Sequence, residues 1–231
     1  MNLKGLYDQH DKHIVALDCI IFGFDQKELK LLLVKRDMEP QKGSWSLMGG
    51  FLKSNETIDE GAKRILHNLT GLSGLYMEQL YAYGNLDRDP VARTISIAFY
   101  ALIKTDNYNT ELADSHNAQW FSMADIPPLI FDHDQMVKKA LGRLRRRARI
   151  QPIGFELLPE KFTIPQLRSL YEAINARVYD PRNFSKKIST MEWLVKLNEK
   201  NKTSSRKGAF YYRFDKDRYQ QLLSEGFNFE L

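Results

Sequence analysis

The segment GFLKSNETIDEGAKRILHNLTGL, residues 50–72, predicts a glycine turn followed by an amphipathic helix, and it determines what the first half of the chain resembles. Apolar residues recur at helical spacing after the turn, as in a helix that packs one side on a core. These residues are Ile58, Ala62, Ile65, Leu66 and Leu69. A second set keeps a fixed spacing along the same segment: Gly50, Glu56, Arg64, Leu66, Gly71 and Leu72.

The second set resembles the Nudix box, whose pattern is G-x5-E-x7-R-E-U-x-E-E-x-G-U, with U an aliphatic residue. The spacing is complete, but Ile65, Asn68 and Leu69 stand where the three later glutamates belong. In a helix these positions share one face, so the glutamates would point together toward a divalent cation. Mg²⁺ needs several oxygen ligands, which two aliphatic side chains and one amide do not supply. The sequence therefore predicts no bound metal, no cofactor and no enzymatic activity.

Length and composition indicate two soluble domains. The chain has 231 residues, 43% of them hydrophobic and 12% aromatic, which is enough for two packed cores. No apolar run reaches the roughly 18 residues that a membrane span needs, and the N-terminus lacks the pattern of a secretion signal. Cys19 is the single cysteine and lies in an apolar run, so we expect a buried thiol. These features predict a cytoplasmic protein with no membrane partner.

The first domain is predicted to span residues 1–149. Branched apolar runs at 14–24 and 29–35, separated by a turn, favour a hairpin. The resemblance to Nudix proteins implies an α/β/α sandwich, so the expected fold class is α/β. Further strands are expected at 81–84, 94–103 and 119–121, and a closing helix carries Met136, Val137, Ala140, Leu141 and Leu144.

Residues 150–231 have the order of a winged helix-turn-helix domain. Thr163, with Gln166 three residues on, predicts the start of a first helix. Asp180 and Pro181 predict the start of a second, basic helix. The second helix has an apolar side at Phe184, Ile188 and Met191, and strands are expected at 193–197 and 209–214, joined by a basic tip at 198–208.

Positive charge is concentrated in two segments, one at the end of the first domain and one in the second domain. The formal charge is +5 overall, yet residues 138–149 hold seven Lys or Arg and no acid, and residues 196–213 hold six against Glu199 alone. In a winged helix the second helix enters the major groove while the wing meets phosphates. We predict Arg182, Asn183, Lys186 and Lys187 for the groove, and Lys200, Lys202, Ser204, Ser205, Arg206 and Lys207 for the phosphates. The alternative is a small helical domain with a solvated basic loop.

Over nearly its whole length the chain resembles the Nudix-related transcriptional regulators, the NrtR-like family. Within it, the segments 47–50, 87–90, 116–118 and 131–133 are most similar to the sugar-responsive branch, typified by the L-arabinose-responsive repressor of Bacteroides. The resemblance implies a homodimer that binds a palindromic DNA operator and releases it when a pentose, L-arabinose in that branch, enters the degenerate Nudix-like domain. A symmetric dimer and two half-sites go together geometrically.

The predicted effector site consists of charged residues on segments that border the substrate cleft of the family fold. They are Asp18, Lys35, Arg36, Glu56, Asp87, Arg88 and Arg93. Cationic side chains would also suit a phosphate, so a regulator of NAD metabolism that responds to ADP-ribose is an alternative. A second alternative is a Nudix hydrolase of nucleoside diphosphate derivatives, in which Asp59 or Glu60 replaces the missing metal ligands.

Overall fold

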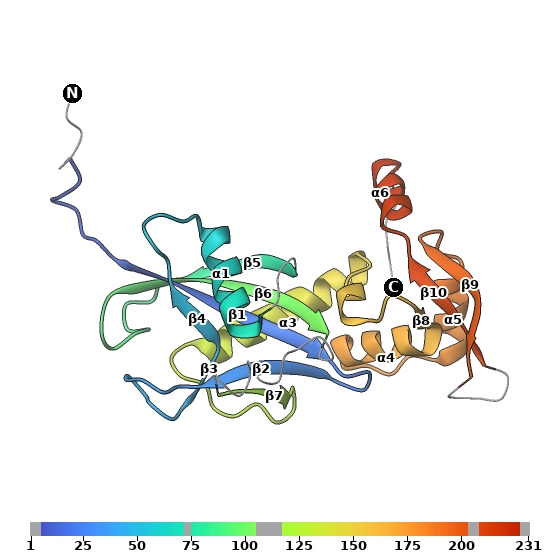
Figure 1. The fold of residues 1–231 in the computed structure, drawn as a ribbon, viewed down its shortest axis with the longest axis horizontal. Helices are drawn as coiled ribbons and strands as arrows, with labels where there is room; N and C mark the ends of the chain where they lie inside the picture. Colours follow the sequence, from blue (N-terminus) through green and yellow to red (C-terminus); the bar gives the residue numbers. More distant parts are fainter. Residues whose placement is uncertain (1–5, 72–74, 105–116, 203–207, 227–231) are drawn as a thin grey trace.

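A computed structural model of the chain describes residues 6–71, 75–104, 117–202 and 208–226. It consists of a mixed α/β domain followed by a smaller winged helix domain, as the sequence predicts (Figure 1). Both the sandwich and the winged helix are therefore confirmed. Within the described residues, no helix has the length and hydrophobicity to cross a lipid bilayer.

The described part of the first domain is built on a seven-stranded sheet. In its middle, β1 (Ile14–Phe24) and β6 (Thr94–Lys104) run parallel over their whole length. β2 (Leu29–Lys35) forms the predicted hairpin with β1, and β5 (Tyr76–Tyr83) lies antiparallel to β6. The shorter strands are β3 (Trp45–Ser46) beside β2, β4 (Met48–Phe51) beside β1 and β7 (Ala118–Ser122) beside β2.

One helix covers each face of this sheet. Leu17 and Ile21 of β1 pack in the same buried cluster as Ile65 of α1 (Ile58–Thr70). The intervening Ile20 joins the cluster of α3 (His133–Ile150), in which Met136 is buried. Because neighbouring residues of a strand point to opposite faces, this alternation places α1 and α3 on opposite sides of the sheet.

β5 is longer than the sequence predicts. It begins at Tyr76, whereas only residues 81–84 were expected to form a strand. Its register against β6 shifts between Gln79 and Tyr81. A bulge of this kind interrupts the alternation of inward and outward side chains, so periodicity alone does not reveal the first half of the strand.

The box helix α1 is fixed by local signals at both ends. Thr57 accepts a hydrogen bond from the Glu60 backbone, and the Glu60 carboxylate accepts one from the Thr57 backbone. This capping box satisfies two amide groups that have no partner within the helix. Gly71 ends the helix at φ 70°, in the left-handed region that glycine adopts without strain.

The second domain contains the predicted helix, turn, helix and hairpin. α4 (Ile164–Asn175) begins with the Thr163 capping box, and α5 (Pro181–Ser189) begins at the Asp180 cap. β8 (Phe162–Thr163), β10 (Ala209–Phe214) and β9 (Leu194–Asn201) form a three-stranded sheet in that order, followed by α6 (Lys216–Ser224). A short 3₁₀ turn, η2 (Phe155–Leu157), connects the two domains.

Two details of this domain differ from the prediction. Trp193 was expected to start a strand, but it is fully buried and packs against Phe155 and Phe214, and β9 starts one residue later. β9 also continues into the predicted loop, because Lys200 pairs with Phe210. Met191, assigned to the apolar side of the second helix, lies beyond its last residue.

A single apolar core joins the two domains. Leu144 of α3, Leu157 of η2 and Leu170 of α4 belong to one continuous buried cluster. The guanidinium of Arg145 also donates a hydrogen bond of 2.8 Å to the carbonyl of Ile174. Core packing resists small displacements, so the winged helix is held firmly against α3.

Candidate functional site

An open cleft of about 770 Å³ lies on the first domain beside the loop that precedes β6. Its lining is rich in amides and charged groups and has an aromatic wall, Phe131. The lining residues are Gln41, Asn85, Leu86, Asp87, Arg88, Pro90, Phe131, Asp132 and Gln135. A few polar groups next to an aromatic wall are typical of a small-molecule site.

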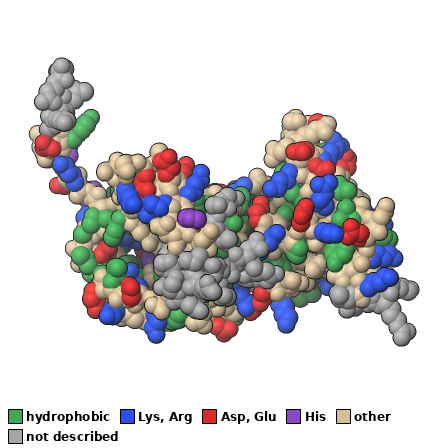
Figure 2. All heavy atoms as spheres, viewed as in Figure 1, with side chains coloured by type: hydrophobic (Ala, Val, Ile, Leu, Met, Phe, Trp, Pro, Cys, Tyr) green, Lys and Arg blue, Asp and Glu red, His purple; other side chains and the backbone are tan. Residues whose placement is uncertain are grey.

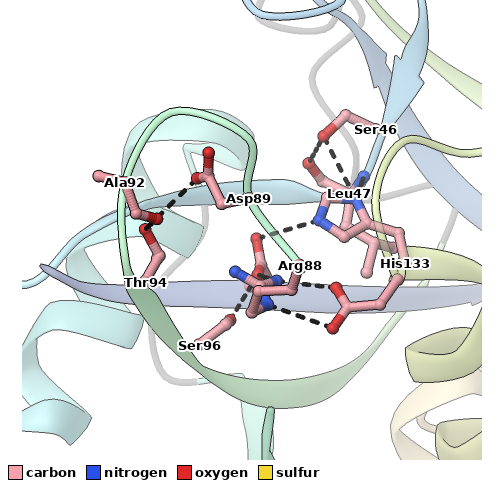
Figure 3. A network of polar contacts seen from close by, with 10 residues as sticks. Ser46, Leu47, Arg88, Asp89, Ala92, Thr94, Ser96 and His133 are labelled. Carbon is pink, nitrogen blue, oxygen red and sulfur yellow. Dashed lines mark hydrogen bonds and ion pairs between the residues drawn. The ribbon is translucent and has the colours of Figure 1, made fainter. Parts of the chain in front are cut away.

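A buried ion network forms the inner side of the cleft (Figure 3). Arg88 donates to both carboxylate oxygens of Asp132, at 3.1 and 2.8 Å. The same guanidinium lies 3.6 Å from the carboxylate of Asp18, and all three side chains are at most 10% exposed. Bidentate arginine–carboxylate pairs fix orientation as well as charge, so Arg88 ties β1 to the start of α3.

Asp18 is held from several sides. Ser96 of the neighbouring strand donates a hydrogen bond of 2.5 Å to its carboxylate. Gly49 faces the other oxygen of Asp18, and a Cβ at position 49 would collide with that oxygen. Since the space beside the carboxylate accommodates only a glycine, Gly49 has a local role in admitting Asp18.

His133 completes the network as a neutral imidazole. The Leu47 backbone donates to its Nδ1 at 3.1 Å, so the ring hydrogen lies on Nε2, which is 3.8 Å from Asp18. Burial lowers the pKa of His133 below its usual range, although the charges of Asp18 and Asp132 act in the opposite direction. A protonated ring would bring an N–H against the Leu47 amide, which agrees with the lowered pKa.

Acid is therefore expected to destabilise the protein partly through His133. The pKa of this group is lower in the folded state than its ordinary value of 6.5, so its contribution is complete above pH 6.5 and is lost as the pH falls toward the folded value. Glutamine at position 133 keeps an acceptor for the Leu47 amide but has no titratable group. In His133→Gln the free energy of unfolding should therefore decrease less as the pH is lowered. Urea unfolding at a series of pH values measures this dependence. An equal change of unfolding free energy with pH in both proteins would contradict the prediction.

Of the predicted effector residues, the structure brings five to the cleft or its surroundings. Asp87 and Arg88 line it, and Asp18 lies behind Arg88. The guanidinium carbon of Arg36 lies 5.9 Å from the centre of the Phe131 ring, and Arg93 donates to the carbonyl of the lining residue Asn85 at 3.2 Å.

The other two predicted effector residues lie elsewhere. Lys35 is exposed at the end of β2, opposite Trp45. Glu56 accepts two hydrogen bonds from Arg64, at 2.8 and 2.6 Å, and one from the Lys53 backbone at 2.9 Å. The Arg64 hydrogen bonds, with that from Lys53, lower the pKa of Glu56 to about 2. Its carboxylate is thus engaged in fixing the turn before α1.

The face that carries the metal ligands in the Nudix pattern has no carboxylate at its two described positions, Ile65 and Asn68. Ile65 is 3% exposed and belongs to the core, and a Cβ at Gly50 would lie 3.3 Å from it. Asn68 is exposed. In the described parts of the chain, no group of three or more His, Cys, Asp or Glu side chains is placed to hold a metal ion.

The second candidate site is the outer surface of α5. Phe184 and Ile188 anchor the helix in the core, and the side chain of Asp180 caps it with a 2.8 Å hydrogen bond from Asn183. All four residues predicted to enter the groove are exposed: Arg182, Asn183, Lys186 and Lys187. Lys and Arg side chains are spread over the visible face of this domain (Figure 2).

The wing adds a cationic surface beside α5. Lys196 and Lys200 of β9 lie over the ring of Phe210 in β10, at 3.9 and 4.5 Å from its centre. The predicted contact residue Lys202 is exposed. Ser204, Ser205, Arg206 and Lys207 fall outside the residues that the structure describes.

Sequence reasoning missed several of these residues. Asp132, His133 and Gln135 were not assigned to the effector site, although all three lie at the start of α3 beside the cleft or its network. The available signal was an Asp directly before a strongly amphipathic segment. Lys196 and Phe210 were also missed, because stacking across a hairpin depends on register.

The fold and the two sites define a Nudix-type domain joined to a winged helix DNA-binding module. Family models agree: residues 12–140 match the NUDIX domain, and residues 154–214 match the NrtR DNA-binding winged helix domain. The chain therefore belongs to the Nudix family, and within it to the NrtR-like regulators.

Individual relatives share one or both halves. The ADPR responsive transcriptional repressor NtrR of Acinetobacter baylyi is 29% identical over 87% of this chain and 82% of its own length. The ADP-ribose pyrophosphatase of Methanocaldococcus jannaschii is 37% identical over 54% of this chain and 70% of its own.

Shewanella oneidensis NrtR is similar over both domains. Its crystal structure with a 27mer DNA has a TM-score of 0.80 and 27% identity, covering 93% of this chain and 97% of that one. The structure of its NUDIX domain with ADP ribose has a TM-score of 0.52 and 27% identity, covering 62% and 99%.

Proposed function

We propose that this protein is a transcriptional repressor that binds operator DNA through α5 and the wing and responds to a small molecule in its Nudix domain. The observation that carries the proposal is the exposed row of Arg182, Asn183, Lys186 and Lys187 on a helix anchored by Phe184 and Ile188. Arginine and lysine suit guanine and phosphates, and asparagine suits adenine. Of the relatives that match both domains, one is named a transcriptional repressor and another was crystallised with a 27mer DNA.

We further propose ADP-ribose as the effector, in place of the pentose predicted from the sequence. The support comes from three relatives: an ADPR responsive repressor, an ADP-ribose pyrophosphatase and a NUDIX domain crystallised with ADP ribose. A free pentose is the second candidate. One observation favours it: the cleft offers the amides of Gln41, Asn85 and Gln135, which suit sugar hydroxyls.

A binding panel separates these effectors. ADP-ribose, L-arabinose, other pentoses, hexoses and nucleotide sugars are titrated into the full chain by calorimetry and thermal shift. We expect ADP-ribose to raise the melting temperature, since a ligand at a hundredfold its Kd stabilises by about 2.7 kcal/mol. It should also weaken binding to a duplex selected from a randomised pool. A response to a pentose alone would replace ADP-ribose by the sugar, and a response to neither would refute both effectors.

We propose that the Nudix domain senses its ligand without hydrolysing it. Buried Ile65 and exposed Asn68 supply no carboxylate where the Nudix pattern has two of its glutamates, and Glu56 is engaged by Arg64. Phosphate release in the same titrations, with Mg²⁺ or Mn²⁺ added, should stay at background. Sustained turnover of ADP-ribose would instead establish the hydrolase alternative.

The remaining partners are a second copy of the chain and a palindromic operator. An elongated two-domain subunit presents one groove-reading helix, α5. Two such helices related by a twofold axis read half-sites one helical turn apart, or a multiple of it. This arrangement would be supported by a dimer in sedimentation and by an inverted repeat in the selected duplexes.

A further inference from the structure

Asp132 holds an unusual position at the start of α3. It is the N-cap residue, and an aspartate there normally accepts a hydrogen bond from an amide of the first turn. Its side chain makes no such bond. Both carboxylate oxygens accept from Arg88 instead. The same carboxylate therefore has two possible partners: the guanidinium of Arg88, and the first-turn amide of Gln135, which donates at 3.0 Å to the backbone carbonyl of Asp132.

A ligand in the cleft lies next to both possible partners of the Asp132 carboxylate. Arg88, Asp132 and Gln135 all line the cleft, so a molecule bound there lies against the ion pair and the first turn of α3. Two oxygens of a phosphate group can accept from one guanidinium in the same bidentate geometry as a carboxylate. A nucleoside diphosphate in the cleft would thus compete with Asp132 for Arg88.

The other end of α3 reaches the DNA-binding domain. The helix has 18 residues, which corresponds to a length of about 27 Å. Near its C-terminus Arg145 donates to the Ile174 carbonyl at the end of α4, and Leu144 and Ala148 share the core of the winged helix. Since α3 packs as a rigid element in both domains, a shift at its first turn is transmitted to α4 and α5.

We propose that the Arg88–Asp132 ion pair holds α3 in the position that favours DNA binding, and that a phosphate-bearing effector releases DNA by drawing Arg88 away from Asp132. The freed carboxylate then accepts from the Gln135 amide in place of the Asp132 backbone carbonyl and caps α3, so it keeps a hydrogen-bond partner in the second arrangement. This inference rests on the proposed function. It adds the residues through which the cleft controls the winged helix, and a ligand shifts the balance only by preferring one arrangement.

The first test uses no effector. Asp132→Asn keeps the size of the side chain but weakens the ion pair, so it should mimic the effector and reduce affinity for the selected duplex by roughly tenfold, a typical allosteric coupling. Asp134→Asn is the matched control: it removes the same charge from the same turn, but Asp134 is exposed and lies outside the network. Its affinity should stay within about twofold of the wild type.

The second test adds ADP-ribose. The wild type and Asp134→Asn should lose affinity for the duplex, whereas Asp132→Asn should respond several-fold less. Arg88→Lys, which keeps the charge but loses the bidentate geometry, should behave like Asp132→Asn. Thermal unfolding confirms that each variant is folded, and if Asp132→Asn is not, Arg88→Lys decides.

The outcomes separate the inference from the function on which it rests. A wild type that selects no duplex, or that ignores ADP-ribose, overturns the proposed repressor or its effector. A wild type that responds, together with Asp132→Asn and Arg88→Lys variants that bind and respond as it does, overturns the ion-pair switch alone.

Discussion

Replacing both Lys186 and Lys187 by alanine is expected to lower affinity for the selected duplex by roughly a hundredfold, since each groove or phosphate contact contributes about 1–3 kcal/mol. Both side chains are exposed on α5. The helix should persist, because its anchors Phe184 and Ile188 and its Asp180 cap are unchanged. Fluorescence anisotropy with a labelled duplex measures the effect over a range of salt concentrations.

A variant with the same loss of charge controls for the general electrostatic field. Lys27 and Lys216 are exposed, one in the β1–β2 turn and one on α6. Replacing both by alanine removes two charges without touching α5 or the wing, and we expect less than about a threefold effect. Equal losses in the two double variants would mean that net charge, and not the surface of α5, determines DNA binding.

The second large effect is expected on stability. Arg88→Met should lower the free energy of unfolding by about 3–5 kcal/mol, because it leaves buried carboxylates without their cation. The affected groups are Asp18 and Asp132, both at most 10% exposed. Chemical denaturation at neutral pH measures the loss, and circular dichroism confirms that the variant is folded.

Two further variants assign the loss to the buried charges. Adding Asp132→Leu to Arg88→Met removes one of the stranded carboxylates, so the double variant should be less destabilised than the sum of the single ones. Arg64→Met breaks a similar bidentate pair with Glu56 near the surface. Its loss should be much smaller because solvent screens that pair. Similar losses at positions 64 and 88 would show that burial of the network is not decisive.

The box segment keeps the local architecture of the Nudix pattern although three of its glutamate positions carry other residues. α1 keeps its capping box and its terminal Gly71, and Arg64 still binds Glu56. These interactions position a helix and a turn, and they do not require a metal. Ile65, in contrast, adds to the core. The conserved spacing of such a motif therefore predicts the fold more securely than it predicts hydrolysis.

Most of the fold was predictable from local sequence. The starts of α1, α4 and α5 follow from capping residues, Thr57, Thr163 and Asp180, whose hydrogen bonds span three residues. The β1–β2 hairpin follows from two branched apolar runs and a short turn. These signals are readable because each depends on neighbours in the chain. The first half of β5 and the limits of β9 were not predictable, since a bulge and a cross-strand register set them.

The two candidate sites also differ in how far they were predictable from local sequence. The residues of α5 were predicted together, because one helix presents them and its apolar stripe fixes which side is exposed. The cleft was predicted only in part. Asp18, Arg88 and Asp132 are separated by dozens of residues. The sequence alone does not indicate which carboxylate pairs with Arg88.

The sequence by itself determined two domains, their order, a box helix with aliphatic residues at metal positions and a basic helix with an apolar anchor. These properties follow from spacing, capping and amphipathicity, which act over a few residues. Only the tertiary structure decided that Arg88 pairs with Asp132, that His133 is neutral and that α3 links the cleft to the winged helix. Such features depend on burial and on contacts between distant segments, and both exist only once the chain has folded.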